Sequence, residues 1–167
     1  AYSGNNIRSA VTADGTGFWT AGANSGIRYV PFGNTTNTAT SSVSTTVTNN
    51  RVVTIQGGQL YASNSSGTNA GVMAIGSGTP TGSASHLALT GLANIGSVYG
   101  YAFLDLDAGV PGVDTAYLVG DSNFGLRKYA LSGGAWAQVG STVTGNYINL
   151  TASVTAGVVN IFYTSAG

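Results

Sequence analysis

The chain has 167 residues, and its five basic and five acidic side chains balance to a net charge of zero. A neutral chain argues against nucleic acid binding, which needs clustered Lys and Arg, and the absence of cysteine excludes disulfides and thiolate metal sites. Hydrophobic residues make up 43% of the chain, enough for one domain with a real core, but no apolar run approaches the roughly 18 residues of a membrane span.

Charged residues make up only 6% of the chain, so its polar surface must consist of Ser, Thr, Asn, Gln and Gly. Such a surface favours a secreted or cell-surface β protein over a cytosolic enzyme. The same residues disfavour long helices, whereas short runs of Val, Ile, Thr and Tyr between turn residues predict strands. We therefore expect an all-β fold in an extracellular or cell-surface protein.

The first unit spans residues 5–50. Asp14-Gly15 is a strong hairpin turn signal, and Pro31 places the third strand at an edge or ends it there. The Thr/Ser-rich segment 38–50 is predicted as an outer, partly exposed strand, with a mobile loop as the alternative. The four strands predicted in this unit are 7–13, 17–23, 27–33 and 38–50.

Three further units follow. The second, residues 51–92, and the third, residues 98–143, each predict four strands, and the fourth, residues 147–167, predicts two. An inserted turn at 108–113 lengthens the third unit. The predicted strands are 51–57, 59–65, 70–76 and 86–92, then 98–107, 114–121, 124–133 and 135–143, and finally 147–155 and 158–167.

The units form an internal repeat. An aromatic residue of the second strand aligns them at Trp19, Tyr61, Tyr117 and Phe162, with spacings of 42, 56 and 45 residues. The third strand then opens with Gly and an aliphatic residue. A period of about 40–50 residues with four strands per unit is typical of β-propeller blades, which stack face to face around an axis. The alternative is an antiparallel β-sandwich.

The segment DTAYLVGDSNFGLRKYALSGGAW, residues 114–136, resembles the blades of secreted bacterial β-propellers of the NHL/SMP-30-like kind. Residues 5–33 are similar to stretches of large, uncharacterised bacterial extracellular proteins with the same repeats. The likeness covers most of the chain and implies a propeller fold, but its motifs are structural and it carries over no catalytic residues.

Residues 1–167 hold about three and a half such blades, fewer than the roughly four to eight that close a ring. We therefore expect a single all-β domain or propeller fragment that further blades or another chain complete. The chain is then part of a larger protein or a homo-oligomer. An open arc would expose two blade faces and a strand edge.

Catalytic motifs are scarce in the sequence. His86 is the only histidine, which excludes zinc sites with two or three histidine ligands and makes any Ser-His-Asp triad depend on this residue. We expect His86 to be a surface or interface residue. The sequence contains neither a G-x-S-x-G nucleophile elbow nor a phosphate-binding glycine motif.

Four of the five acidic residues fall close together, at Asp105, Asp107, Asp114 and Asp121. Asp105 and Asp107 would share one face of a predicted strand, and oxygen ligands on one face suit Ca²⁺. These four residues are a candidate calcium site, calcium being the one cofactor that the sequence suggests. The alternative is that they accept backbone N–H groups in turns. A glycosidase carboxylate pair is a third interpretation.

Aromatic side chains are the other candidate for binding, because sugar-binding propellers combine Trp or Tyr faces with polar neighbours. The candidate ligand-binding residues are Trp19, Tyr99, Tyr101, Asn123 and Trp136. The alternative is that these aromatic residues form the core between blades.

We expect a non-enzymatic, extracellular or cell-surface propeller-type module for binding or adhesion, with a glycan or protein partner, or a structural spacer. The alternative function is a self-assembling filament or surface-layer subunit that a neighbouring chain completes. The third is an enzyme that acts on carbohydrate.

Overall fold

The structure is a computed structural model that describes residues 7–35 and 40–165. Within these ranges the chain forms fourteen strands, β1 to β14, and one short 3₁₀ helix, Gly67–Asn69. None of the helical structure in the described ranges has the length and apolar character of a membrane-spanning helix. The prediction of an all-β fold is therefore confirmed.

Twelve of the strands form three antiparallel four-stranded sheets, each in simple sequential order. The first sheet contains β1 (Ile7–Val11), β2 (Gly17–Gly22), β3 (Ile27–Pro31) and β4 (Ser41–Ser44). The second contains β5 (Asn50–Gln56), β6 (Gln59–Asn64), β7 (Gly71–Ile75) and β8 (His86–Ala93). The third contains β9 (Val98–Leu104), β10 (Thr115–Gly120), β11 (Gly125–Ser132) and β12 (Ala135–Val143). A C-terminal hairpin consists of β13 (Tyr147–Thr155) and β14 (Val158–Ser165).

Two predicted strands end at least three residues before their predicted ends. The segment 38–50 contributes only Ser41–Ser44 to the first sheet, and its residues 38 and 39 lie outside the described ranges. The strand predicted over 98–107 ends at Leu104. The buried Asp114 carboxylate accepts the backbone N–H groups of Leu106 and Asp107, and so turns the chain away from the sheet. The prediction that Asp105 and Asp107 share a strand face is therefore wrong.

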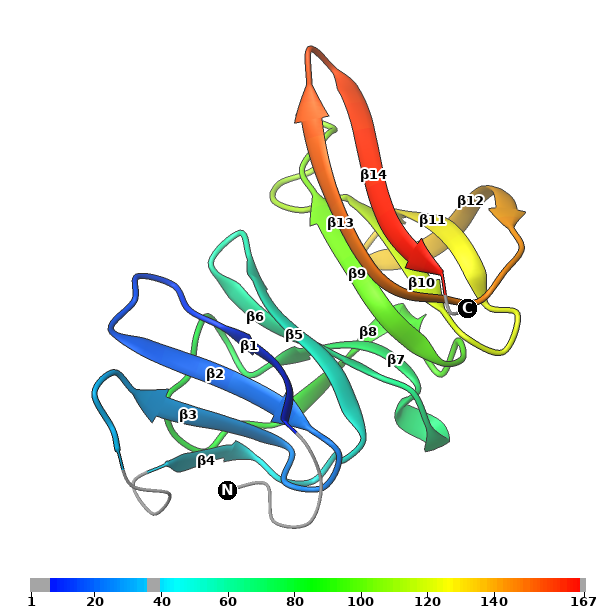
Figure 1. The fold of residues 1–167 in the computed structure, drawn as a ribbon. Coiled ribbons are helices and arrows are strands. Elements are labelled where there is room, and N and C mark those ends of the chain that lie inside the picture. Colours follow the sequence, from blue (N-terminus) through cyan, green and yellow to red (C-terminus); the bar gives the residue numbers. More distant parts are fainter. Residues whose placement is uncertain (1–6, 36–39, 166–167) are drawn as a thin grey trace.

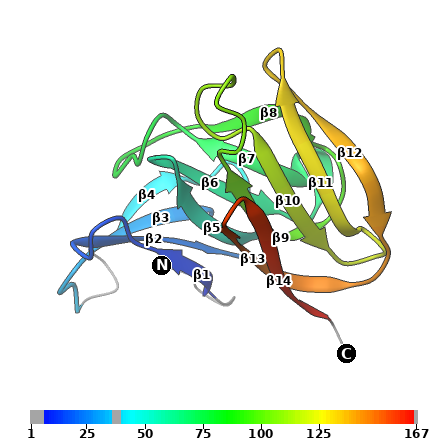
Figure 2. The ribbon, with the colours of Figure 1, turned by 90° about the horizontal axis from the view of Figure 1, so that it is seen from above.

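The sheets stack through their first strands, which lie side by side at the centre of the molecule (Figures 1 and 2). β1 contacts β5, β5 contacts β9, and β9 contacts β13. The backbone N–H of Val53 on β5 donates to Ser9 Oγ on β1 at 2.9 Å, which ties the first two sheets together. Away from the centre, β8 contacts β12.

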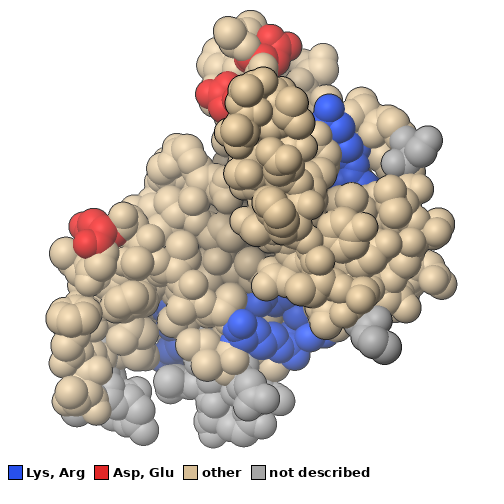
Figure 3. All heavy atoms as spheres, turned by 45° about the horizontal axis from the view of Figure 1, so that its top comes forward, with Lys and Arg blue, Asp and Glu red and all other residues tan. Residues whose placement is uncertain are grey.

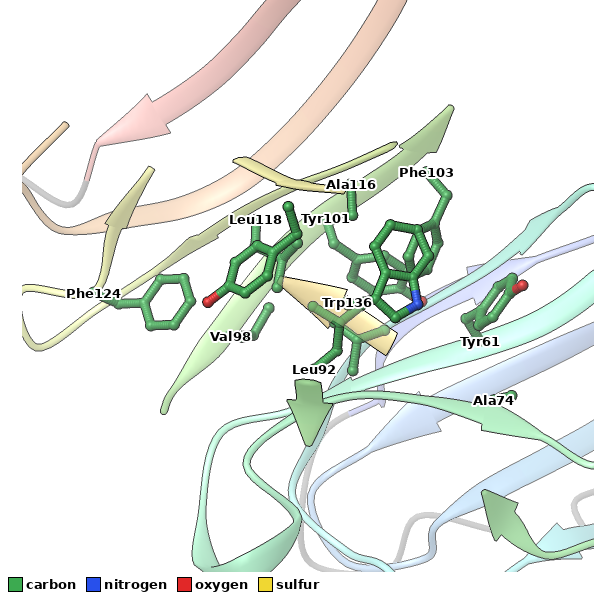
Figure 4. Packing of buried hydrophobic residues seen from close by; sticks show 12 residues of the cluster. Tyr61, Ala74, Leu92, Val98, Tyr101, Phe103, Ala116, Leu118, Phe124 and Trp136 are labelled. Atoms are coloured by element: carbon green, nitrogen blue, oxygen red, sulfur yellow. The ribbon is translucent and has the colours of Figure 1, made fainter. Parts of the chain in front are cut away.

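Three hydrophobic clusters fill the spaces between successive layers. Trp19 and Ile27 of the first sheet pack with Leu60 of the second, and Leu150 of the hairpin packs with Val119 of the third sheet. The largest cluster lies between the second and third sheets (Figure 4). Its large members are Tyr61, Leu92, Tyr101, Phe103, Leu118, Phe124, Tyr129 and Trp136. Burying one such side chain stabilises the fold by about 1.5–3 kcal/mol.

The repeated Gly-aliphatic pair has a steric cause. Gly26, Gly71 and Gly125 stand at the start of the third strand in each sheet, with positive φ angles of 64°, 141° and 74°. A Cβ at these positions would collide with the carbonyl oxygens of Ser44, Leu92 and Val143, respectively. Only glycine lets the third strand approach the fourth so closely.

Candidate functional site

The larger of two candidate sites is a pocket of about 470 Å³ between the second and third sheets. Tyr61 of β6 and Trp136 of β12 contribute to its wall. Both rings pack on Phe103, whose ring centroid lies 4.6 Å from that of Tyr61 and 5.2 Å from that of Trp136 (Figure 4). We call this space the inter-sheet pocket.

The inter-sheet pocket also contains neutral hydrogen-bonding groups. Its lining includes the side chains of Gln56 and Thr90 beside the phenol of Tyr61 and the indole of Trp136. Within the described part of the chain, none of these four side chains makes a hydrogen bond. Tyr61 and Trp136 are each 8% exposed. Burial raises the pKa of Tyr61, which keeps its hydroxyl protonated as a donor.

The second site lies where the first strands of all four layers meet. Each of these strands has a β-bulge near its start, which the shifts in strand register reveal. The bulge positions are Arg8 on β1, Arg51 with Val52 on β5, Tyr99 on β9 and Ile148 on β13. Bulges re-aim side chains and are common beside functional sites.

These same residues line one pocket of about 230 Å³, together with Asn149. Three residues of different layers, Arg8, Arg51 and Tyr99, supply its polar character. We call it the axial pocket. Figure 3 shows Lys and Arg in a few places and Asp in others, on a face that is otherwise uncharged.

Several contacts hold the two arginines in place. Arg8 Nη1 donates to Asn49 Oδ1 at 2.7 Å and to the carbonyl oxygen of Asn50 at 3.2 Å. Arg51 Nε donates to Ser65 Oγ at 2.7 Å, and its Cζ lies 4.1 Å from the centroid of the Tyr99 ring. The Arg51 guanidinium is therefore held by Ser65 at one edge and by the Tyr99 ring on one face.

The axial pocket concentrates positive charge. Partial desolvation, and after it the nearby charge of Arg51, lower the pKa of Arg8, although this side chain is exposed. Burial raises the pKa of Tyr99, the positive charge of Arg51 opposes this shift, and a hydrogen bond with Asp121 adds to it. All five aspartates lie in the described ranges, and none forms an ion pair with Arg8 or Arg51 there.

The structure separates the five predicted ligand-binding residues. Trp19 and Tyr101 are buried in different clusters, where Trp19 Nε1 donates to the carbonyl oxygen of Pro80 and Tyr101 accepts from Thr54. Asn123 lies in an exposed turn. Trp136 lines the inter-sheet pocket and Tyr99 the axial pocket. Only these two of the five predicted residues line a candidate site.

Two of the four aspartates of the predicted calcium site, Asp107 and Asp114, accept hydrogen bonds within their own loop. Asp114 accepts two backbone N–H groups and the hydroxyl of Thr115, and Asp107 accepts the N–H of Gly109. Burial alone would raise the pKa of Asp114, but these hydrogen bonds hold it below its ordinary value. In the described ranges, no three acidic, histidine or cysteine side chains are grouped to hold a metal ion. Calcium binding stays a prediction.

His86 occupies a place between two sheets. Its Nδ1 lies 2.6 Å from Ser44 Oγ of the first sheet. Its Nε2 is buried and has no hydrogen-bond partner among the described residues. Burial lowers the pKa of His86 to about 4, so the ring is neutral at physiological pH. The residue is part of the packing between β4 and β8.

The arginines of the axial pocket were missed in the sequence because their grouping arises only when the layers stack. A sequence signal for the site existed, since Arg8 and Arg51 hold the second position of the first strand in their units, as Tyr99 and Ile148 do in theirs.

Comparisons of the chain with protein-family models, with curated proteins and with solved structures found no match. The two candidate sites therefore rest on their own geometry.

Proposed function

We propose that the chain is a β-propeller-type binding module that holds a neutral sugar in the inter-sheet pocket and serves adhesion at a cell surface or outside the cell. The observation that carries this proposal is the pairing of Tyr61 and Trp136 with neutral polar groups in one pocket. Aromatic side chains supply an apolar wall, and the amide of Gln56 and the hydroxyl of Thr90 match sugar hydroxyls.

Three repeated features support a propeller-type arrangement. The three four-stranded sheets share one strand order, their first strands meet at the centre, and the bulges recur at equivalent positions. The low charge of the chain supports an extracellular location. In the proposed function the pocket binds its ligand without a chemical step, because its lining offers amide, hydroxyl and aromatic groups suited to holding a neutral ligand.

A binding experiment tests this function. Neutral oligosaccharides are titrated against the chain while tryptophan fluorescence is followed, since Trp136 lines the pocket. We expect Gln56→Ala to weaken binding about three- to tenfold, the usual worth of one neutral hydrogen bond. Gln138→Ala is the matched control, because Gln138 is exposed on the same strand as Trp136 and bonds only Thr142. Equal losses in both variants, or the absence of binding, would contradict the proposal.

A second candidate function is self-assembly with further copies of the chain, and the repeated aromatic residues favour it. Trp19 packs against the second sheet, Tyr61 against the third, and Tyr117 against the hairpin. The equivalent Phe162 is 61% exposed on the hairpin. By the same pattern, we propose that another sheet covers Phe162 in the assembled protein.

The opposite end of the stack offers a complementary surface. Phe18 alternates with Trp19 along β2 and so faces away from the second sheet. It lies beside Phe32, which is 74% exposed, with 6.5 Å between the ring centroids. The hairpin carries Val158, 60% exposed, in addition to Phe162. We propose that the first sheet of one copy packs on the hairpin of the next, as an oligomer or a filament.

Light scattering over a wide concentration range tests the assembly. We expect a mass that rises with concentration above 16.6 kDa, the mass of one chain, and we expect Phe162→Ser to abolish the rise. Leu87→Ser is the control, because Leu87 is an exposed apolar residue on β8, away from both ends of the stack. A wild-type chain that stays monomeric throughout would overturn this second function.

A further inference from the structure

We propose that the axial pocket is a second binding site, specific for the carboxylate of an acidic sugar such as a uronic acid. This site shares no lining residue with the inter-sheet pocket. The proposal for the axial pocket is therefore independent of the proposed binding of a neutral sugar.

The backbone directs the side chains into the pocket. Four bulges at equivalent positions bring Arg8, Arg51, Tyr99 and Ile148 to one place, although the residues belong to four separate layers. A bulge leaves one residue without a ladder partner and bends its strand. Its repetition in every layer indicates that the pocket is a regular feature of the architecture and not an accident of one loop.

The charges are unbalanced. The chain has five basic residues in all, and two of them face this pocket of about 230 Å³. Like charges in proximity are unfavourable, and the charge of Arg51 does act on Arg8. The carboxylate of Asp121 acts on Tyr99 of this pocket. None of the five aspartates, all in described ranges, forms an ion pair with either arginine, so a bound anion would relieve the repulsion between the arginines.

The geometry favours a planar anion. Arg51 uses its Nε for Ser65 and one face for the Tyr99 ring, so its orientation is fixed. Within the described residues, its two terminal nitrogens make no hydrogen bond. A guanidinium presents such paired donors to the two oxygens of a carboxylate. Arg8 Nη2 likewise makes no hydrogen bond within the described residues. Arg8 Nη1 donates to Asn49 Oδ1 and to the carbonyl oxygen of Asn50.

The rest of the lining suits a sugar ring. Tyr99 and Ile148 give the pocket apolar surface, and the Asn149 side chain adds an amide beside them. Asn149 Oδ1 accepts the N–H of Leu150, and its amide NH₂ makes no further hydrogen bond in the described ranges. An apolar wall, one amide donor and two guanidinium groups together match the ring, a hydroxyl and the carboxylate of one uronic acid residue.

The test compares five probes by ligand-observed NMR and by the unfolding temperature of the full chain. The probes are glucuronate, glucose, acetate, sulfate and a short peptide with aspartate side chains. We expect glucuronate to bind more tightly than the others and its binding to weaken as salt is raised. Equal binding of acetate or the peptide, preference for sulfate, or no binding of glucuronate would each overturn the proposal.

Matched arginine variants assign the binding to this pocket. We expect Arg51→Gln to weaken glucuronate binding roughly 10- to 100-fold, as is usual for hydrogen bonds to a charged group. Arg127→Gln is the control, because Arg127 has the same kind of support outside the pocket. Its Nε bonds the carbonyl oxygen of Phe124, and its Cζ lies 3.9 Å from the Phe124 ring centroid.

A third variant guards against misfolding. Arg8 is exposed, so Arg8→Gln should leave the unfolding temperature nearly unchanged while it weakens glucuronate binding at least severalfold. Retained binding in both Arg8→Gln and Arg51→Gln would overturn the site, whatever the stability of either variant. If the unmodified chain binds glucuronate but no neutral oligosaccharide, only the proposed function of the inter-sheet pocket is rejected.

Discussion

The guanidinium carbon of Arg51 lies 4.1 Å from the centroid of the Tyr99 ring, so that a side chain of β5 stacks on one of β9. Both residues occupy bulges, where side chains leave the regular alternation of a strand. This contact joins the second and third sheets at the centre of the molecule. It also holds the charged group that the axial pocket presents to a ligand.

We expect Tyr99→Leu to lower the free energy of unfolding by about 0.5–1 kcal/mol, the usual worth of a cation–π contact near the surface. Urea unfolding at low salt measures the change. Tyr99→Phe separates the ring from its hydroxyl, since this variant keeps the stacking surface and loses the hydroxyl that interacts with Asp121. If Tyr99→Phe lowers the free energy of unfolding as much as Tyr99→Leu does, the stacking of the ring on Arg51 contributes nothing to stability.

Acid should weaken the packing between the first and second sheets through His86. Its pKa is lowered by burial to about 4 in the folded chain, against 6.5 for a free side chain. The unfolded state therefore binds the proton more readily, and stability falls as the pH drops from about 6.5 to 4. We expect a loss on the order of 2 kcal/mol across this window.

Denaturant unfolding at several pH values checks the role of His86, with His86→Gln for comparison. The substitution should flatten the pH dependence between 4 and 6.5, because glutamine does not titrate. Loss of stability below pH 4 should persist in the variant, since the hydrogen-bonded Asp114 has a lowered pKa and is protonated only in more acidic solution. An unchanged slope between pH 4 and 6.5 in His86→Gln would assign the effect elsewhere.

The glycine that opens β7 should be intolerant of any side chain. At Gly71, φ is 141° and a Cβ would collide with the carbonyl oxygen of Leu92 on β8. We expect Gly71→Ala to lower the free energy of unfolding by about 3 kcal/mol. Gly82→Ala is the control, because a Cβ there meets nothing within 4 Å. Thermal unfolding of both variants distinguishes the close strand approach from a general effect of losing glycine.

The loop after β9 should depend on Asp114. Asp114→Asn replaces a carboxylate oxygen, which accepts N–H groups of Leu106 and Asp107, with an amide that can satisfy them only in part. We expect a loss of about 1–3 kcal/mol, the cost of a buried polar group left unpaired. The exposed Asp105 supplies the comparison, and Asp105→Asn should leave stability within about 0.5 kcal/mol. Similar losses in both variants would mean that the carboxylate of Asp114 does not hold the loop.

Much of the fold could be predicted from the sequence because its signals are local. Turn residues separate short apolar runs, and the Gly-aliphatic pair marks the third strand of each sheet through a contact between neighbouring strands. The segment 38–50 was overestimated as a strand, since its Thr and Val residues favour extended backbone whether or not a partner strand is present. The end of β9 was placed too late because a carboxylate ten residues along the chain, at Asp114, terminates that strand.

The candidate sites could be predicted only in part, because both arise between layers. Trp136 and Tyr99 were proposed from residue type alone, yet Trp19 and Tyr101 had equal claim and line neither pocket, while Trp136 is itself a buried member of the largest cluster. Composition does not reveal which aromatic residue borders a pocket. Arg8 and Arg51 belong to different units and are far apart in the sequence, and only the stacking of β1 on β5 brings them together.

The repeated aromatic residues give the stack of sheets a direction. Trp19, Tyr61 and Tyr117 each pack toward the next layer, so the surface around Phe162 differs from the surface around Phe18. A contact between these two ends is heterologous, because it joins different surfaces of the two copies. Such contacts generate closed rings when the rotation per copy divides a full turn, and open helical polymers when it does not. The symmetry of any assembly formed through these ends is therefore cyclic or helical.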